Sequence, residues 1–231
     1  LNSDCIKCIL YRYLERVPKE LPSDKLTEYY QSLCKIIGEA STEEGAPVVV
    51  HTIKEKLYDL YGVREDFTKE KYYFNHMMLL NEPIIEESVY SASDPLKKAL
   101  QYAMTGNYID FGTMNVVNEE YLQQLLKTVE ERPVSEKVYM NMRNDLSVAK
   151  KLMFITDNCG EIVLDKVLIK SIKQYFPQID ITVMVRGGET INDATMTDAQ
   201  EVGLTELVKV IHNGNDIAGT CLSKLSEEAL Q

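Results

Sequence analysis

The feature that most constrains the fold of this 231-residue chain is a change in its hydrophobic pattern near residue 150. Beyond that point, short apolar runs of strand length alternate with segments of helical length. We expect strands at residues 151–156, 179–185 and 207–211, and helices at 161–175 and 195–202. Strands that alternate with helices pair in parallel through right-handed crossovers. The C-terminal part therefore predicts a Rossmann-like parallel sheet with flanking helices.

The first 148 residues have the three- and four-residue apolar spacing of amphipathic helices. The first such stripe consists of Ile6, Ile9, Leu10, Tyr13, Leu14 and Val17. Further helices are expected at residues 23–37, 47–61, 66–80, 95–105, 118–131 and 134–147. A bundle of short helices buries such stripes against one another. The expected fold class is α/β, with a helical domain over residues 1–148 and a Rossmann-like α/β domain over residues 149–231.

The charge balance argues against two classes of partner. The chain has 36 acidic and 25 basic side chains, a formal net charge of −11. Binding to nucleic acid or to an anionic membrane needs clustered basic residues, whereas a small anionic ligand needs only one local pocket.

No apolar run approaches the roughly 20 residues of a membrane span, and no signal peptide is recognisable. Five scattered cysteines are typical of reduced thiols. We therefore expect a cytoplasmic protein without a nucleic-acid or membrane partner.

Polar residues follow the first two predicted strands at their carboxyl ends, where ligands of open parallel sheets bind. Asp157, Asn158 and Glu161 come after the first strand, and Asp193 lies in the loop after the second. If the two strands are neighbours, Asp157, Asn158 and Asp193 meet at one edge, and their oxygens suit Mg²⁺ or Mn²⁺. A phosphate bridging that cation would lie at the N-terminus of the helix beginning near Glu161.

The same residues also have a purely structural interpretation. Asn158 and Glu161 have the spacing of a capping box, and Asp and Asn are common in turns. In that case the chain is a non-catalytic interaction module whose helical domain binds a partner. A third hypothesis is a methyltransferase that binds an adenosyl cofactor on the Rossmann-like layer. The sequence lacks the glycine-rich first turn of such folds, and it has no phosphate-binding loop of the Gly-x-x-x-x-Gly-Lys type.

The cysteines and histidines suggest weaker hypotheses. Cys5 and Cys8 form a Cys-x-x-Cys, half of a metal site that Cys34 could join if the first two helices pack together. Buried thiols are the alternative. The three histidines, His51, His76 and His212, are far apart in the sequence and are expected to be ordinary core or surface residues.

One more segment, Gly106-Asn107-Tyr108-Ile109-Asp110, combines turn residues at the end of a predicted helix. In a structural interpretation, Gly106 caps that helix and Asn107 adopts a left-handed turn. In a functional interpretation, Asn107 and Asp110 reach a substrate in a cleft between two domains.

Together these motifs resemble the damage-control phosphatases, a family of metal-dependent phosphatases, in the microbial branch with an N-terminal Cys-x-x-Cys. The resemblance covers essentially the whole chain. It rests on Cys5-x-x-Cys8, Gly106–Asp110, Asp157–Glu161, Ile191–Thr195 with Asp198, and Gly214–Asp216 leading to Gly219-Thr220.

The resemblance implies a helical domain joined to a Rossmann-like domain, and hydrolysis of phosphomonoesters such as sugar phosphates with Mn²⁺, Co²⁺, Ni²⁺ or Mg²⁺. The implied partner is a small phosphorylated metabolite. The implied metal ligands and catalytic residues are Asp157, Asn158 and Asp193. The implied substrate-binding residues are Asn107, Asp110, Gly160, Arg186 and Asn192. Asp198 or Glu161 would serve as a base or as a supporting acceptor.

The chain departs from the family pattern at two places. In the family, a Lys-Gly-x-x-Asn segment after the last motif supplies a lysine to the substrate phosphate, whereas this sequence stops at Gln231. We therefore expect either a truncated C-terminal domain or a cation from elsewhere, with Arg186 the nearest candidate. Gly187 and Gly188 also replace a loop that often contains proline, which leaves the rigidity of the loop open.

Overall fold

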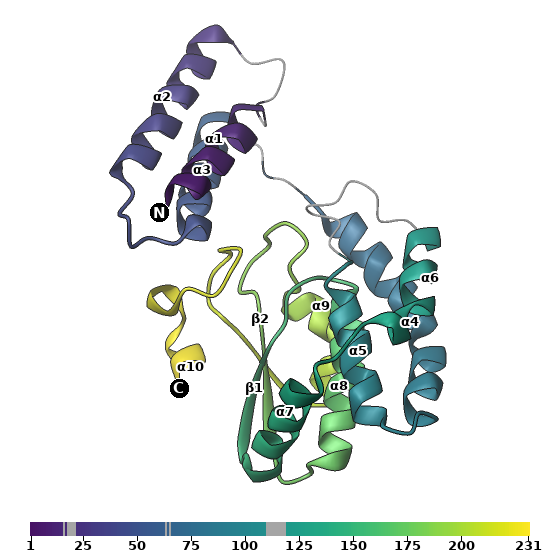
Figure 1. Cartoon of the computed structure of the whole chain (residues 1–231). Helices are drawn as coiled ribbons and strands as arrows, with labels where there is room; N and C mark the ends of the chain where they lie inside the picture. The colour runs from purple at the N-terminus through teal and green to yellow at the C-terminus, as the bar shows by residue number, and fades with distance from the viewer. Residues whose placement is uncertain (16, 18–21, 63, 65, 110–118) are drawn as a thin grey trace. The chain divides into compact units, whose positions relative to one another are not determined.

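The structure is a computed structural model, and it describes residues 1–231 except 16, 18–21, 63, 65 and 110–118 (Figure 1). The chain forms two compact units. The first unit comprises Leu1–Asp66 with Asp216–Leu225, and the second comprises Phe67–Asn215 with Ser226–Gln231. The predicted domain boundary near residue 148 lies inside the second unit, because the helices that precede it share a core with the sheet.

The first unit consists of helices that follow the predicted apolar stripes. Its elements are α1 (Ser3–Glu15), α2 (Ser23–Glu39), α3 (Ala46–Tyr61) and the 3₁₀ helix η3 (Leu222–Lys224). Its core contains Ile9, Tyr13, Tyr29, Leu33, Val49 and Ile53. The buried Tyr29 hydroxyl donates a hydrogen bond to the Tyr13 carbonyl over 3.0 Å. Helix α3 has Pro47 in its first turn and is capped at its C-terminus by Gly62, whose left-handed backbone suits glycine.

The second unit contains the sheet. Its α-helices are α4 (Thr68–Tyr90), α5 (Pro95–Gly106), α6 (Glu119–Lys127), α7 (Glu136–Val148), α8 (Glu161–Tyr175), α9 (Met196–Glu201) and α10 (Glu227–Leu230), and its 3₁₀ helices are η1 (Val129–Glu131) and η2 (Leu204–Glu206). Its strands are β1 (Lys151–Ile155), β2 (Asp180–Val185) and β3 (Lys209–His212). All three strands pair in parallel in the order β1-β2-β3, so the α/β class is confirmed.

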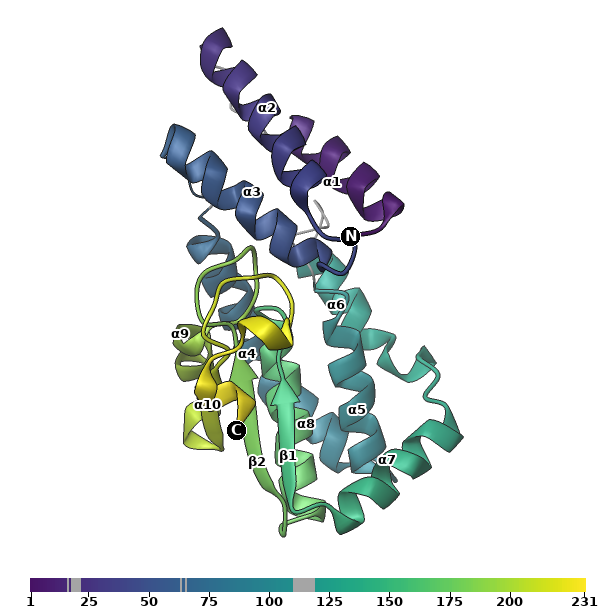
Figure 2. The ribbon, with the colours of Figure 1, turned by 90° about the vertical axis from the view of Figure 1, so that its left-hand side faces the viewer.

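Helix α8 is the centre of the second unit. Ile162, Val163 and Leu164 follow one another along the helix and point in different directions, yet none is exposed to solvent. Apolar residues that point in several directions from one helix must be covered from each of those directions. Helices α4 and α5 pack against α8, which lies between them and the sheet (Figure 2).

Helix α4 is longer than the sequence analysis predicted. The prediction ended at residue 80, but the helix continues through Pro83 to Tyr90. Proline in a helix interior removes one backbone hydrogen bond and disfavours the helix. Beyond Pro83, however, Ile85 and Val89 lie on one helical face and are buried in the core of the second unit, which offsets this cost.

No helix in the described part of the chain is both long enough and apolar enough to span a bilayer.

The burial of α8 makes a testable prediction about stability. Leu164 is fully buried, so Leu164→Ala removes apolar contacts and leaves a cavity. We expect the free energy of unfolding to fall by about 2–5 kcal/mol in chemical denaturation. Leu80→Ala, on α4 with the leucine 67% exposed, is the matched control and should change it by less than about 0.5 kcal/mol. Equal effects of the two substitutions would contradict the central position of α8.

Candidate functional site

The loops that follow β1 and β2 are joined by backbone hydrogen bonds. Asn158 and Asp193 form an antiparallel bridge. The Cys159 N–H donates to the Asn192 carbonyl over 2.8 Å, and the Ala194 N–H donates to the Asp157 carbonyl over 2.7 Å. The structure therefore brings together the three predicted metal ligands, Asp157, Asn158 and Asp193, on paired stretches of backbone.

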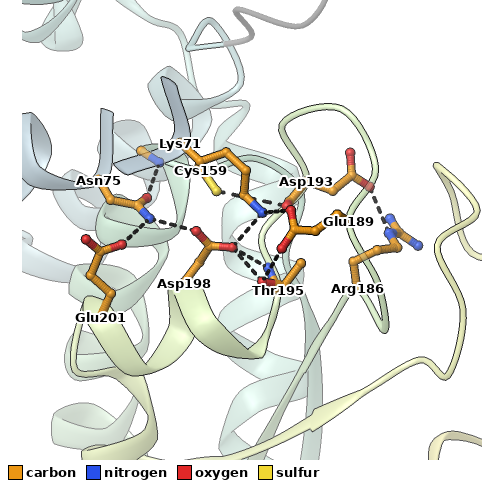
Figure 3. Close-up of polar contacts among 10 residues, drawn as sticks. Lys71, Asn75, Cys159, Arg186, Glu189, Asp193, Thr195, Asp198 and Glu201 are labelled. Carbon is orange, nitrogen blue, oxygen red and sulfur yellow. Dashed lines mark hydrogen bonds and ion pairs between the residues drawn. The ribbon is translucent and has the colours of Figure 1, made fainter. Parts of the chain in front are cut away.

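Arg186 is engaged with one of these residues. Its Nε donates to Asp193 Oδ2 over 2.8 Å, and both side chains are more than nine-tenths buried (Figure 3). A buried ion pair of this kind holds the Asp193 carboxylate in a defined orientation. The guanidinium that the sequence analysis proposed for the substrate phosphate is thus located directly beside a predicted metal ligand.

Asn158 does not cap α8, so the predicted capping box of Asn158 and Glu161 is wrong. The N-cap residue of α8 is Gly160, with φ of 81° and no capping side chain. The Asn158 side-chain amide donates instead to Asp157 Oδ2 over 3.0 Å and to Glu161 Oε2 over 3.2 Å. Because φ of Gly160 is positive, the N-cap of the helix is Gly160, two residues beyond Asn158. The Asn158 side-chain amide therefore orients the carboxylates of Asp157 and Glu161.

Two glycines allow helices to approach this turn closely. A Cβ atom on Gly160 would lie 3.2 Å from Ile109 Cγ2 and 3.3 Å from Phe74 Cβ. A Cβ atom on Gly106 would lie 2.7 Å from Glu161 Cγ. Gly106 is therefore a contact point between α5 and α8 rather than a helix cap, and this contact places the end of α5 beside the candidate site.

The predicted substrate-binding residues have different surroundings. Asn107 is the exposed C-cap of α5 and has right-handed helical dihedrals, so the left-handed turn proposed for it is wrong. Asn192 is buried in the bridged turn. The Gly160 N–H is donated to Asn75 Oδ1 over 2.8 Å. Asp110 lies outside the described residues. Substrate binding at these four positions stays a prediction.

Another acidic side chain, which the sequence analysis missed, belongs to this group. Asp165 lies one helical turn after Glu161 on α8 and is buried. Burial, followed by the negative charges of Glu161 and Asp157, raises the pKa of Asp165 well above its ordinary value. The site therefore gathers acidic groups that a nearby cation would stabilise. The signal in the sequence was the four-residue spacing of Glu161 and Asp165.

The turn that carries Asp193 is held from α4 by residues that sequence reasoning also missed (Figure 3). Lys71 Nζ lies 2.9 Å from Asp198 Oδ2 and 2.5 Å from Glu189 Oε2. Asn75 Nδ2 donates to Asp198 Oδ1 over 3.0 Å and to Glu201 Oε2 over 3.1 Å. Lys71 and Asn75 are four residues apart and lie on one helix face, but nothing in the sequence specifies a partner more than 100 residues away.

Asp198 is committed to structure. Its Oδ2 accepts hydrogen bonds from the Thr195 N–H and the Thr195 hydroxyl, each over 2.8 Å, which forms the capping box of α9. Burial raises the pKa of Asp198, but the charge and hydrogen bond of Lys71 and the Thr195 hydrogen bonds outweigh burial and hold the pKa below its ordinary value. Both carboxylate oxygens already accept hydrogen bonds, which argues against Asp198 as the base.

Cys159 is not suited to act as a nucleophile. Burial, together with the negative charge of Asp198, raises the pKa of its thiol far above the ordinary value. Since the thiolate is the reactive form of cysteine, this residue is neutral at physiological pH.

The loop after β2 is fixed by a close backbone contact. The Gly187 N–H donates to Asn213 Oδ1 over 2.7 Å and to the Asn215 carbonyl over 2.9 Å. A Cβ atom on Gly187 would lie 2.5 Å from the Asn215 nitrogen. The glycine is therefore required by the approach of residues 213–215, and these contacts hold the loop.

The three N-terminal cysteines do not form a metal site. Cys8 and Cys34 are exposed and Cys5 is half-buried. Among the described residues, the one group of three or more His, Cys, Asp or Glu side chains with metal-binding spacing is His51, Glu55 and Asp216. The alternative, that Cys5 and Cys8 are two buried thiols, is wrong for Cys8.

Comparison with known proteins identifies the family to which this chain belongs. The family model described as "Damage-control phosphatase ARMT1-like domain" matches residues 1–231. The chain belongs to the ARMT1-like damage-control phosphatase family. This membership, which confirms the resemblance, places the chain among the phosphatases. No part of the chain lies outside the matched region, so both units belong to the family domain.

Individual relatives agree with this family. A damage-control phosphatase of Archaeoglobus fulgidus is 28% identical over 231 residues, covering 97% of this chain and 78% of the relative. A damage-control phosphatase of Pyrococcus horikoshii is 28% identical over 204 residues, covering 85% of this chain and 67% of the relative. The crystal structure of a DUF89 family protein from Pyrococcus horikoshii has the same fold, with a TM-score of 0.79 and 23% identity, over 100% of this chain and 79% of that chain.

The lowered pKa of Asp198 predicts how stability depends on pH. A carboxylate whose folded pKa is depressed contributes stability above its unfolded pKa, near 4, and loses it as pH falls through the folded pKa. We expect the free energy of unfolding to decrease with acidification below about pH 4 in the wild-type chain, and to decrease less steeply in Asp198→Asn. Denaturant titrations at several pH values measure both slopes. Asp59→Asn, at an exposed position of α3, should retain the wild-type slope, and the same slope in Asp198→Asn would disprove the assignment.

Proposed function

We propose that this chain is a divalent-metal-dependent phosphatase that hydrolyses phosphomonoesters of small metabolites such as sugar phosphates. The observation that carries the proposal is the Asn158–Asp193 bridge, which joins the polar loops after β1 and β2. It is supported by family membership and by relatives named damage-control phosphatase. The parallel order of β1, β2 and β3 also supports a Rossmann-like layer, which binds ligands at this edge.

The donor set fits a hard divalent cation. Asp157, Asn158 and Asp193 would hold the ion through two carboxylates and an amide oxygen, the ligand types preferred by Mg²⁺ and Mn²⁺. Such an ion supplies charge that polarises a phosphoryl group and a position for the attacking water. The chain's own contribution is to hold these ligands: Arg186 orients Asp193, and the Asn158 amide orients Asp157.

Two groups that favour an anion, Arg186 and the N-terminus of α8, also lie in the second unit. Arg186 lies next to Asp193, and the N-terminus of α8 begins one turn after Asp157, so both the guanidinium and the helix dipole favour an anion there. We propose that Arg186 contacts the substrate phosphate while it remains paired with Asp193. Glu161, which is buried and bonded to Asn158, is the better candidate for a base or acceptor, because Asp198 is already occupied.

Phosphate release from a panel of sugar phosphates in the presence of Mn²⁺ tests this function. Because Asp193 is a proposed ligand, Asp193→Asn should lower the rate at least about 100-fold, and EDTA should remove the activity of the wild-type chain. Asp180→Asn is the matched control, since Asp180 is exposed at the opposite end of β2.

The outcomes separate the parts of the proposal. A rate that survives in Asp193→Asn would contradict the site, and a rate that survives EDTA would contradict metal dependence. Circular dichroism of both variants distinguishes lost activity from lost folding.

A further inference from the structure

A second group of potential metal-ligating side chains belongs to the first unit, whereas the residues of the proposed phosphatase site belong to the second. His51 and Glu55 are one helical turn apart on α3, so they lie on the same helix face. Asp216 is the first residue of the segment Asp216–Leu225. Their candidate ligand atoms, one from each side chain, all lie within 4.8 Å of one another.

The backbone holds Asp216 at this position. The segment Asp216–Leu225 belongs to the same compact unit as α3 and lies beside the N-terminal end of that helix (Figures 1 and 2). A Cβ atom on Gly219 would lie 3.3 Å from Pro47 Cγ, so the segment is packed directly on the first turn of α3. The three side chains thus converge because two pieces of backbone are in contact.

A simple ion pair explains the geometry less well than a metal ion does. His51 Nδ1 and Asp216 Oδ1 are 3.4 Å apart, whereas a charge-assisted hydrogen bond is about 2.7–2.9 Å long. Bonds of about 2.0–2.2 Å from nitrogen and oxygen to a transition metal separate adjacent ligand atoms by roughly 3–3.5 Å. The observed separation matches the spacing expected of two ligands of one ion.

An ion pair with Arg64 competes with a metal ion for Glu55, and this pair is weak. Arg64 Nη2 lies 3.3 Å from Glu55 Oε2, and its guanidinium also stacks on the Tyr58 ring at 4.2 Å. The side chains of Arg64 and Glu55 are 55% and 41% exposed, and an exposed pair contributes little to stability. A bound cation would attract Glu55 more strongly, and Arg64 would keep its contact with Tyr58.

We propose that His51, Glu55 and Asp216 form a second divalent transition-metal site. One imidazole and two carboxylates suit Mn²⁺ or Zn²⁺ better than Mg²⁺, because imidazole is a borderline ligand. Three protein ligands leave further positions for water. An ion bound there ties the segment Asp216–Leu225 to α3 and so stabilises the first unit. The site differs chemically from the proposed phosphatase site, whose ligands are all oxygens.

This chemical difference supplies a specific test. Mn²⁺ is titrated into the full, tag-free chain after removal of metals, in a buffer without imidazole, and bound Mn²⁺ is examined by electron spin echo envelope modulation. A coordinated imidazole adds ¹⁴N modulation, which an oxygen-only site does not produce. We expect the wild-type chain to show this modulation, and His51→Gln and Glu55→Gln each to bind one Mn²⁺ fewer per chain.

The matched control is Asp59→Asn, which removes one negative charge from an exposed position of the same helix, one turn beyond Glu55. It should bind as many Mn²⁺ ions as the wild-type chain and keep the ¹⁴N modulation. Modulation that persists in His51→Gln, or a wild-type chain without modulation, would overturn the proposal. Loss of bound Mn²⁺ in Asp59→Asn equal to that in Glu55→Gln would do so as well, since it would indicate general attraction to an acidic surface.

The two metal sites can be distinguished in the same experiment. Asp193→Asn should reduce the number of bound Mn²⁺ ions without removing the ¹⁴N modulation. His51→Gln should remove the modulation and leave phosphate release by the second unit in place. Circular dichroism of each variant checks that the helices of the first unit are retained.

Discussion

The backbone pairing of β1 with β2 continues past the ends of the strands, and the candidate site depends on this continuation. The Thr156 N–H still donates to the Met184 carbonyl, and the loops then pair again between Asn158 and Asp193. Residues more than 30 positions apart in the sequence are fixed relative to one another by main-chain hydrogen bonds, which do not depend on side-chain rotamers. The polar side chains of the site are carried by this frame.

Buried charged and polar side chains stabilise these paired loops. Lys71 and Asn75 on α4 contact Asp198 at the start of α9, and Arg186 pairs with Asp193. Removing one partner of such a buried pair is costly, because the other charge is left without compensation. Each of these groups has its hydrogen-bond partners within the unit, so the turn has few alternative arrangements. This is the kind of support that a site with demanding ligand geometry requires.

The sequence predicted the parts of this structure that depend on periodicity. The helical stripes, the three strands and their parallel pairing follow from spacing. The meeting of Asp157 with Asp193 was predicted only on the condition that their strands are neighbours, and the pairing of β1 with β2 meets that condition. The support from α4 could not be predicted, because a lysine and an asparagine in a helix do not reveal partners so distant in sequence. The capping box was assigned to the wrong place. Asn158 and Thr195 are each followed three residues later by an acidic residue. The positive φ of Gly160 makes Gly160, not Asn158, the N-cap of α8, whereas Thr195 and Asp198 form the capping box of α9.

The path of the chain near its C-terminus has a consequence for cooperativity. The segment Asp216–Leu225 leaves the second unit, joins the first, and returns at Ser226. The residues that flank this segment are hydrogen-bonded to each other, since the Ser226 N–H donates to the Asn213 carbonyl over 2.9 Å. The segment is thus a loop whose two ends stay together in the second unit even when its middle part unfolds with the first unit. The two cores can then melt at different temperatures, and no single midpoint would describe the unfolding of this chain.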